Sequence, residues 1–388
     1  MTAESIRNEV ITFAQEIIRI NSPSCQEGEV AGLVERKMST LNYDSVRVDS
    51  FGNVIGTRDG KHPGPVILFD GHMDVVPVTN PEEWSCDPFS ADIRDDKIWG
   101  LGATDMKGPL AAAIIALGHI PAEDIYGKLV ISATVAEELC EGVAVSKVLE
   151  EVKPDFVVIC EPSGCCVGVG QKGRAGMWVD VSGKSAHSSQ PSMGDNAIYK
   201  AMNVIERLRS MTLPSNSLLG EGIMELIDGI SSPYPSQSTL PFNFRMHYDR
   251  RLLQEETIDS VLNSINKALE GLPDWKTGFL RIKRKTYTGK MIDEVDFHPG
   301  WLIDSTSPWI KKAQAGLQRF GIEPQLFFAQ YCTNGSQTAG VEKIPTMIFG
   351  PSSVTLAHHV NEYIEINELQ RGLEGYSGLA KSLGHQET

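Results

Sequence analysis

The sequence lacks the features of a membrane protein, an exported protein or a nucleic-acid-binding protein. No segment approaches the ~20 consecutive apolar residues of a membrane span, and the first residues, Met-Thr-Ala-Glu-Ser, do not form a signal peptide. The 50 acidic residues outnumber the 35 lysines and arginines, and the formal net charge of −15 at pH 7 disfavours nucleic acid and anionic membranes as partners. We therefore expect a cytoplasmic protein.

Cysteine is scarce, and internal repeats and low-complexity tracts are absent. An odd number of cysteines, 7 in a chain of 388 residues without an export signal, is typical of reduced thiols. Cys160, Cys165 and Cys166 lie close together, but their spacing is not C-x-x-C, so we do not expect a zinc–thiolate site. Hydrophobic side chains make up 41% of the chain, enough for two domains with their own cores.

Side chains that bind metals or transfer protons are present in several short motifs. The motifs are F-D-G-H-M-D-V-V-P, A-T-D-M-K-G, T-V-A-E-E-L and V-V-I-C-E-P-S, with a further histidine near the C-terminus. The residues are His72, Asp74, Asp105, Glu137, Glu138, Glu161 and His358. Zinc prefers such a mixture of imidazoles and carboxylates, and clustered carboxylates repel one another unless a cation lies between them. The motifs therefore predict a metal site.

Apolar, strand-like segments precede most of these candidates, at residues 66–69, 129–134 and 156–159. Their β-branched residues and flanking turn residues are typical of buried parallel strands. Asp105 instead precedes an Ala- and Ile-rich segment, 106–117, that indicates the start of a helix. Because open α/β sheets bind ligands at the carboxyl ends of their strands, we predict an α/β fold in which these loops meet at one edge of a mainly parallel sheet.

Taken together, the motifs resemble those of the M20 family of zinc hydrolases, which includes acetylornithine deacetylase, succinyl-diaminopimelate desuccinylase, aminoacylase and glutamate carboxypeptidase. The similarity covers nearly the full length and rests on the order of H-M-D-V-V-P, W-x-x-D-P-F, G-L-G-A-T-D-M-K-G, E-E, C-E-P-S, G-K-S-A-H and A-H-H-V-N-E-Y-I. The resemblance implies a zinc-exopeptidase-like catalytic domain, residues 1–175 and 289–388, with an inserted α+β ferredoxin-like lid and dimerisation domain at 176–288.

The pattern of elements in the insertion agrees with this division. Strand-like and helical segments follow one another in the order βαββαβ, which is the order of a ferredoxin-like domain. The expected strands are 175–181, 223–230, 243–249 and 279–287, and the expected helices are 196–211 and 258–272. Two segments rich in glycine and polar residues, 164–176 and 288–299, are expected to be the hinges.

The resemblance further implies a centre with two zinc ions, for which Co²⁺ or Mn²⁺ are possible substitutes. Asp105 would bridge the ions, His72 and Glu161 would hold one of them, and Glu138 and His358 would hold the other. A bridging carboxylate keeps two cations roughly 3.5–4 Å apart, a separation at which one water is shared and activated.

Three further residues have expected catalytic roles. Glu137 is the expected general base, because two adjacent carboxylates do not easily reach one metal together. Asp74 lies two residues after His72, close enough to accept its ring N–H and fix the tautomer. His187, in G-K-S-A-H, matches the family histidine that donates to the oxyanion, often across a dimer interface.

Some of these assignments have ordinary structural alternatives. Any one of the residues alone fits a partly buried histidine or a helix N-cap. His187 lies in a segment that also fits a polar turn, and the acidic pair, followed by Glu141, also fits a solvated loop. His359 competes with His358 as a ligand, and only the family spacing from His358 to Glu362 favours the first.

The region around 243–249 predicts substrate contacts. Polar and apolar residues alternate there, as in a half-exposed strand. The D-R-R that ends it resembles the family's D-x-R and places Arg251 where a substrate carboxylate would be held, with Arg245 as the alternative. Asn334 and Gly335 stand where relatives carry a Gly-rich loop that binds the same carboxylate through backbone N–H groups. An ion-paired strand face is the ordinary explanation for both arginines.

The sequence thus predicts a dizinc amidohydrolase that removes an N-acyl group from an amino acid or related small molecule and forms a homodimer through the lid. A glutamate at position 161 favours the acylases and carboxypeptidases of the family over its aminopeptidases and dipeptidases. One alternative is an exopeptidase or dipeptidase that cleaves short peptides. Another, of a different class, is a non-catalytic binding or assembly protein, although binding alone would not need Glu137.

Overall fold

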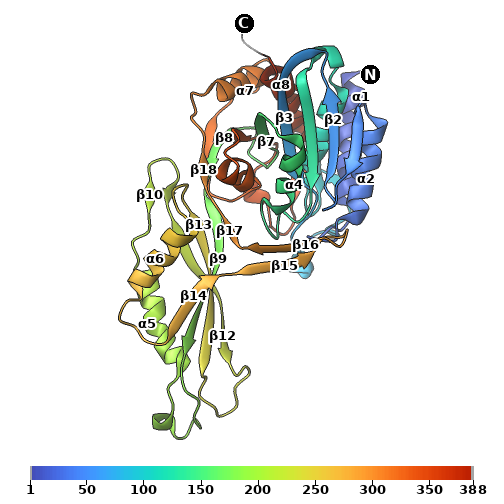
Figure 1. Cartoon of the computed structure of the whole chain (residues 1–388). Helices are drawn as coiled ribbons and strands as arrows, with labels where there is room; N and C mark the ends of the chain where they lie inside the picture. The colour runs from blue at the N-terminus through green and yellow to red at the C-terminus, as the bar shows by residue number, and fades with distance from the viewer. Residues whose placement is uncertain (1, 386–388) are drawn as a thin grey trace.

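The computed structural model of the protein describes residues 2–385, which form two bodies, each built around its own sheet (Figure 1). The larger body contains the first and last helices of the described chain, and the smaller one extends away from it as a five-stranded sheet with two helices on one face. No helix within 2–385 is long and apolar enough to cross a membrane. All of the cysteines lie in this range and are free thiols.

Nine strands of the described chain form the larger sheet, in the order β1-β2-β6-β3-β7-β20-β8-β18, with β19 also paired to β8. Its centre, β6-β3-β7-β20, is parallel, and the strands toward its edges add antiparallel pairs. This arrangement confirms the predicted α/β fold. The strands are β1 (Ser45–Val48), β2 (Val54–Asp59), β3 (His62–His72), β6 (Tyr126–Thr134), β7 (Phe156–Ile159), β8 (Val167–Gln171), β18 (Trp301–Leu302), β19 (Leu326–Ala329) and β20 (Thr346–Ile348).

Helices cover both faces of this sheet. Along β3, Ile67 and Phe69 face a core shared with most of the helices, while Leu68 faces Val145 and Val148 of α4 on the other side. Both faces of the central strands are therefore buried, which explains why they read as continuous apolar runs. The helices are α1 (Ala3–Ile18), α2 (Gly28–Thr40), α3 (Lys107–His119), α4 (Val143–Val152), α7 (Pro308–Gln318) and α8 (Ile366–Leu383).

The smaller sheet has the predicted ferredoxin-like organisation. Its elements follow one another as β9-α5-β12-β13-α6-β14, and its strands lie side by side as β12-β13-β9-β14, all antiparallel. Buried residues of α5 recur at helical spacing, at Ala197, Ala201, Val204 and Leu208, so one stripe of this helix packs on the sheet. The elements are β9 (Gly173–Ser182), α5 (Ala197–Arg209), β12 (Ile223–Ser232), β13 (Asn243–Leu252), α6 (Ile258–Ala268), β14 (Trp275–Phe279) and the short β17 (Phe297–His298), which pairs with β9.

The chain crosses between the two sheets at two adjacent places. Lys172 alone separates β8 of the larger sheet from β9 of the smaller one, and residues 299–300 alone separate β17 from β18. These crossings lie in or next to the segments expected as hinges, 164–176 and 288–299, but strands occupy much of both segments. The glycine-rich composition did not indicate these strands: Gly168 and Gly170 lie inside a buried strand where other side chains and backbone approach closely.

The predicted strand 279–287 is also divided differently. β14 ends at Phe279, and β15 (Arg281–Lys285) leaves the sheet to pair with β16 (Met291–Val295). The tip of this hairpin reaches back to the larger body, where the Tyr287 hydroxyl donates to the Gly52 carbonyl at 3.0 Å. The smaller elements are β4 (Asp92–Arg94), β5 (Lys97–Trp99), β21 (Tyr363–Glu365), β10 (Ser215–Asn216), β11 (Gly220–Glu221), η1 (Pro81–Glu83), η2 (Ala122–Asp124), η3 (Pro191–Met193), η4 (Ser336–Val341) and η5 (Val354–Leu356).

Candidate metal centre and active site

The predicted metal ligands come together from five segments of the larger body. His72 is the last residue of β3, Glu138 lies in the turn after β6, and Glu161 follows β7. Asp105 precedes α3, and His358 comes from the loop between β20 and β21. The first three lie where parallel strands end at one edge of the sheet, which is where this fold places ligands.

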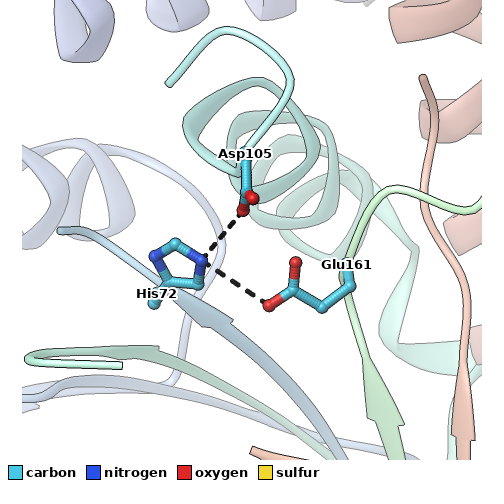
Figure 2. A group of neighbouring side chains, drawn as sticks. All are labelled: His72, Asp105 and Glu161. Atoms are coloured by element: carbon cyan, nitrogen blue, oxygen red, sulfur yellow. Dashed lines mark hydrogen bonds and ion pairs between the residues drawn. The ribbon is translucent and has the colours of Figure 1, made fainter. Parts of the chain in front are cut away.

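The first group of possible ligands consists of His72, Asp105 and Glu161 (Figure 2). Nε2 of His72 is 3.2 Å from Oδ1 of Asp105 and 3.5 Å from Oε1 of Glu161. Figure 2 shows the imidazole and both carboxylates directed toward one point between them. His72 and Glu161 are buried, so water does not solvate this group freely.

The second group consists of Asp105, Glu138 and His358. Nε2 of His358 is 3.1 Å from Oε1 of Glu138 and 3.4 Å from Oδ2 of Asp105. The two groups therefore share Asp105, which presents Oδ1 to the first and Oδ2 to the second. His359 belongs to neither group.

The ring of His72 is held so that Nε2 faces the other ligands. Nδ1 lies 2.9 Å from the backbone carbonyl of Asp74 and 3.6 Å from its carboxylate, so the closer acceptor is the carbonyl rather than the expected carboxylate. The carboxylate instead accepts the backbone N–H groups of Glu137 and Glu138, each at 3.1 Å, and the hydroxyl of Ser24 at 2.6 Å. Asp74 therefore organises the acidic turn as well as the histidine.

Glu362 fixes the loop that carries Asp105. Its buried carboxylate accepts the backbone N–H groups of Gly102, Thr104 and Asp105 at 3.0, 2.7 and 2.9 Å. The sequence singled out Glu362 only through its spacing from His358. No local pattern indicates that it holds a loop more than 250 positions away in the chain.

The site gathers more negative charge than its protein surroundings stabilise. Burial raises the pKa of Glu137 well above its usual range, and the charges of Glu161, Glu141 and Glu138 raise it further. Hydrogen bonds with Asp105 and Glu138 raise the pKa of His358 to about 11. Each shift signals a carboxylate cluster that attracts positive charge, whether from protons or from metal cations.

The donor set fits divalent metal ions. In each group the ligand atoms lie within 4.8 Å of one another and combine one imidazole nitrogen with two carboxylate oxygens. With Nδ1 of His72 donating to the Asp74 carbonyl, Nε2 carries the lone pair that a metal requires. These residues would hold two ions that share Asp105, as zinc and similar metals accept such ligands.

A cavity of about 390 Å³ opens beside the two groups. It lies between the larger body and the smaller sheet, because Arg174 of β9 and Asp249 and Arg251 of β13 form part of its wall. The lining residues are Asp105, Glu137, Glu138, Glu141, Glu161, Arg174, Asp249, Arg251, Tyr331, Cys332, Val354, Ala357 and His358. Glu137 is 6% exposed, and its Oε1 has no hydrogen-bond partner among the described residues.

The two arginines that were weighed as carboxylate ligands lie in different places. Arg251 lines the cavity, and its only side-chain hydrogen bond to a described residue runs from Nε to Asp249 at 2.8 Å. Arg245 is exposed, does not line the cavity and donates to both oxygens of Asp180. The structure thus does not support Arg245 at the site, because a carboxylate on the neighbouring strand already occupies its guanidinium. Arg250 between them is buried and paired with Glu256.

Asn334 and Gly335 are near the cavity wall but do not form it, which differs from the expectation that they bind substrate. Asn334 is buried and uses both ends of its amide internally: Nδ2 donates to Asp70 at 2.8 Å, and Oδ1 accepts from the N–H of Gly142 at 2.6 Å. The N–H of Gly335 donates to Oγ1 of Thr333 at 2.9 Å. These groups support the loop, and the neighbouring Tyr331 and Cys332 line the cavity instead.

His187 lies outside the cavity of its own chain. It follows the end of β9 that points away from the larger body, and ten strand residues span about 30 Å. The side chain is exposed, and its Nδ1 lies 2.8 Å from Oγ of Ser189. His187 reaches a metal centre only if the small body moves or a second chain brings it.

Comparison with known families agrees with this geometry. Residues 68–382 match the model of the family described as "Peptidase family M20/M25/M40", and this range includes all of the metal-ligand candidates. The chain belongs to this family. The protein is therefore a hydrolase related to enzymes that cleave amide bonds, as its sequence resemblance to the M20 family implied.

Relatives of this M20 family chain include both characterised and uncharacterised proteins. The uncharacterized protein YgeY of Escherichia coli strain K12 is 30% identical over 372 residues, covering 93% of this chain and 91% of that protein. A succinyl-diaminopimelate desuccinylase of Vesicomyosocius okutanii is 25% identical over 402 residues, covering 97% and 99%. The crystal structure of an M20 family metallo-carboxypeptidase from Sulfolobus solfataricus superposes with a TM-score of 0.76 at 17% identity, covering 97% and 99%. The fold is therefore shared over 97% of this chain.

Proposed function

We propose that this M20 family chain is a dizinc amidohydrolase that removes an N-acyl group from an amino acid or a related small molecule. The observation that carries the proposal is the pair of ligand groups that share Asp105, with Glu137 buried beside them on the cavity wall. A non-catalytic binding protein would require neither an unpartnered buried carboxylate at this position nor two ligand groups that share one residue.

The chain's own residues supply the proton transfers. Metal ions bound to the two groups supply Lewis-acid polarisation and lower the pKa of water at the site. An oxygen of the Glu137 carboxylate takes the proton of the attacking water and later returns it to the nitrogen of the leaving amine. Because Oε1 of Glu137 has no protein partner among the described residues, it is free for this exchange.

Arg251 is the residue that we assign to the substrate carboxylate. Within residues 2–385 its guanidinium donates only through Nε, to Asp249, so the two terminal nitrogens remain available to the cavity. Arg174, which also lines the cavity, instead binds Glu141 at 2.7 Å through Nε and lies 2.9 Å from Asp296 through Nη2. An anionic substrate group is therefore expected at Arg251.

An exopeptidase that cleaves a peptide bond next to a free carboxylate remains the alternative in the same class. The same cavity residues would serve it, and both deacylases and peptidases occur among the relatives. The two differ in the acyl side of the substrate, which has a free amino group in a dipeptide and none in an N-acyl amino acid.

We further propose that the small body pairs with that of a second copy. Strand β12 is at an end of its sheet, so one row of its backbone N–H and C=O groups has no strand partner in the described part of the chain. It also exposes Ile223, Ile227 and Ile230, and α5 exposes Tyr199 and Met202. Such exposed apolar side chains beside an edge strand favour a subunit interface.

The test is a panel of N-acetyl, N-succinyl, N-formyl and N-carbamoyl amino acids with matching dipeptides, assayed after reconstitution with Zn²⁺, Co²⁺ or Mn²⁺. We expect hydrolysis of at least one N-acyl class, and loss of that activity when the substrate carboxylate is converted to a methyl ester. Hydrolysis of dipeptides alone would establish the exopeptidase. Metal-loaded protein that hydrolyses nothing in the panel would contradict the proposal and favour a binding role.

A further inference from the structure

Carboxylates from two other segments hold the turn that presents the proposed base. Three successive backbone N–H groups of this turn each donate to one of these carboxylates: Ala136 to Oε1 of Glu27 at 2.9 Å, Glu137 to Oδ1 of Asp74 at 3.1 Å, and Glu138 to Oδ2 of Asp74 at 3.1 Å. Glu27 is distant in sequence from all the motifs that carry the chemistry. It neither lines the cavity nor belongs to a ligand group.

The side chain of Glu27 is completely buried and connects two turns. The same Oε1 that accepts from Ala136 also accepts the N–H of Cys25 at 2.7 Å. That second turn contains Ser24, whose hydroxyl donates to Asp74 at 2.6 Å. Glu27 and Asp74 therefore connect the acidic turn to the Ser24–Cys25 turn, since both carboxylates accept hydrogen bonds from each of the two turns.

The backbone of Ala136 shows why such support is needed. Its φ of 56° lies in the left-handed region, which non-glycine residues seldom adopt and which persists where the surroundings fix it. The N–H of Ala136 has Glu27 as its acceptor, so this bond holds the residue immediately before Glu137 in its unusual conformation. Loss of the bond would leave a buried N–H without a partner and allow the turn to rotate.

We propose that Glu27 is a positioning residue for hydrolysis, which sets the orientation of Glu137 through the backbone of Ala136. The inference rests on the proposed function, because it assigns Glu27 to the base of that reaction. Glu27 does not contribute through its helix: it is the N-cap of α2, but its side chain makes no capping hydrogen bond.

The chemistry of the contact defines an informative set of variants. Both donors use Oε1, while Oε2 has no partner among the described residues, so one acceptor oxygen at the right distance suffices. Burial, together with the charge of Asp74, raises the pKa of Glu27 to about 7. Glutamine retains the acceptor at the same distance, aspartate withdraws it by one methylene, and alanine removes it. Glu29, exposed in the first turn of the same helix, is the matched control.

The experiment measures kcat, KM, bound metal and backbone amide exchange at 136–138 in metal-reconstituted protein. We expect Glu27→Ala to lower kcat at least about ten-fold with KM within about three-fold, since small misplacements of a catalytic group are costly. The kcat of Glu27→Gln should be within about three-fold of the wild-type value, and the kcat of Glu27→Asp should be lower than that of Glu27→Gln. The kcat of Glu29→Ala should equal the wild-type value. Amides 136–138 should exchange faster in Glu27→Ala and Glu27→Asp but not in Glu27→Gln.

Two results would overturn the inference. One is a Glu27→Asp or Glu27→Ala variant with wild-type kcat and wild-type exchange at 136–138. The other is a Glu27→Gln variant as impaired as Glu27→Asp, which would show that charge or general stability matters and not the acceptor. Because amide exchange does not depend on activity, it decides the positioning even if wild-type protein hydrolyses nothing, an outcome that would refute the proposed function alone.

Discussion

Replacing Glu137 by glutamine separates catalysis from metal binding. Glutamine has nearly the same shape, but its amide does not accept a proton from water. The two ligand groups use Asp105 and Glu138 and do not include Glu137, so Glu137→Gln should bind the same amount of metal as wild type. Glu138→Gln is the contrasting control, because Glu138 lies 3.1 Å from His358 in the second group and its loss should reduce metal content.

The expected loss of activity is large. Removal of a general base commonly lowers the rate by ~10²–10⁴-fold, which corresponds to about 3–5 kcal/mol at about 1.4 kcal/mol for each factor of ten. Steady-state kinetics on the best substrate of the panel gives kcat, and elemental analysis gives bound metal. A Glu137→Gln protein with wild-type turnover would refute the assignment of the base, and one that loses metal would show that Glu137 is a ligand.

The same variant should also alter the stability of metal-free protein. The pKa of Glu137 is raised in the folded state, chiefly by burial, so the folded state binds this proton more tightly than the unfolded chain does. Its contribution to stability is fully present below the unfolded pKa and is lost as pH rises through the folded pKa. Glutamine does not titrate, so the free energy of unfolding of Glu137→Gln relative to wild type should increase with pH above about 4.3. Urea unfolding at several pH values would reveal it, and a difference that falls with pH would contradict the burial argument.

Three other predictions concern the bridge, the substrate carboxylate and the second subunit. Asp105→Ala should lose both metals and all activity, because both ligand groups contain this residue; retention of either metal at wild-type affinity would disprove the bridge. Arg251→Ala should lower kcat/KM for carboxylate substrates about ten- to hundred-fold, as expected for a charged hydrogen bond of about 1.5–3 kcal/mol, whereas Arg245→Ala, away from the cavity, should not. His187→Ala and Glu137→Gln chains, each nearly inactive, should regain part of the activity in mixed dimers, and verified mixed dimers without activity would assign His187 to its own chain or to no site.

Much of the fold was predictable because the apolar runs that form its central strands are visible in short segments of the sequence. The segments 66–69, 129–134 and 156–159 are apolar on both faces and became central parallel strands. The strand Val167–Gln171 was missed because its alternating glycines resemble a flexible linker, although the packing of neighbouring strands leaves no room for larger side chains. The segment 279–287 was assigned to one strand because strand propensity does not reveal with which partner each half pairs.

At the candidate site, too, the sequence indicated local features but not the contacts between distant segments. The ligand types stand out in the sequence because zinc chemistry requires them, and the structure gathers His72 and the carboxylates as two groups. Residues whose side chains bind the backbone of distant segments do not stand out in the sequence. The carboxylates of Glu27 and Glu362 accept backbone N–H groups of turns that lie far away in the chain. The D-R-R pattern favoured Arg251 over Arg245, but no local pattern shows that Arg251 lines the cavity while the guanidinium of Arg245 is paired with Asp180.

The proposed two-metal centre depends on one shared carboxylate, that of Asp105, and metal stoichiometry tests it most directly. Protein stripped with a chelator, titrated with Zn²⁺ and analysed by elemental analysis and calorimetry should bind about two equivalents per chain, and Asp105→Ala should bind neither tightly, because both ligand groups contain Asp105. Saturation of the wild type at one equivalent or less, or two tightly bound ions in the Asp105→Ala variant, would contradict the account.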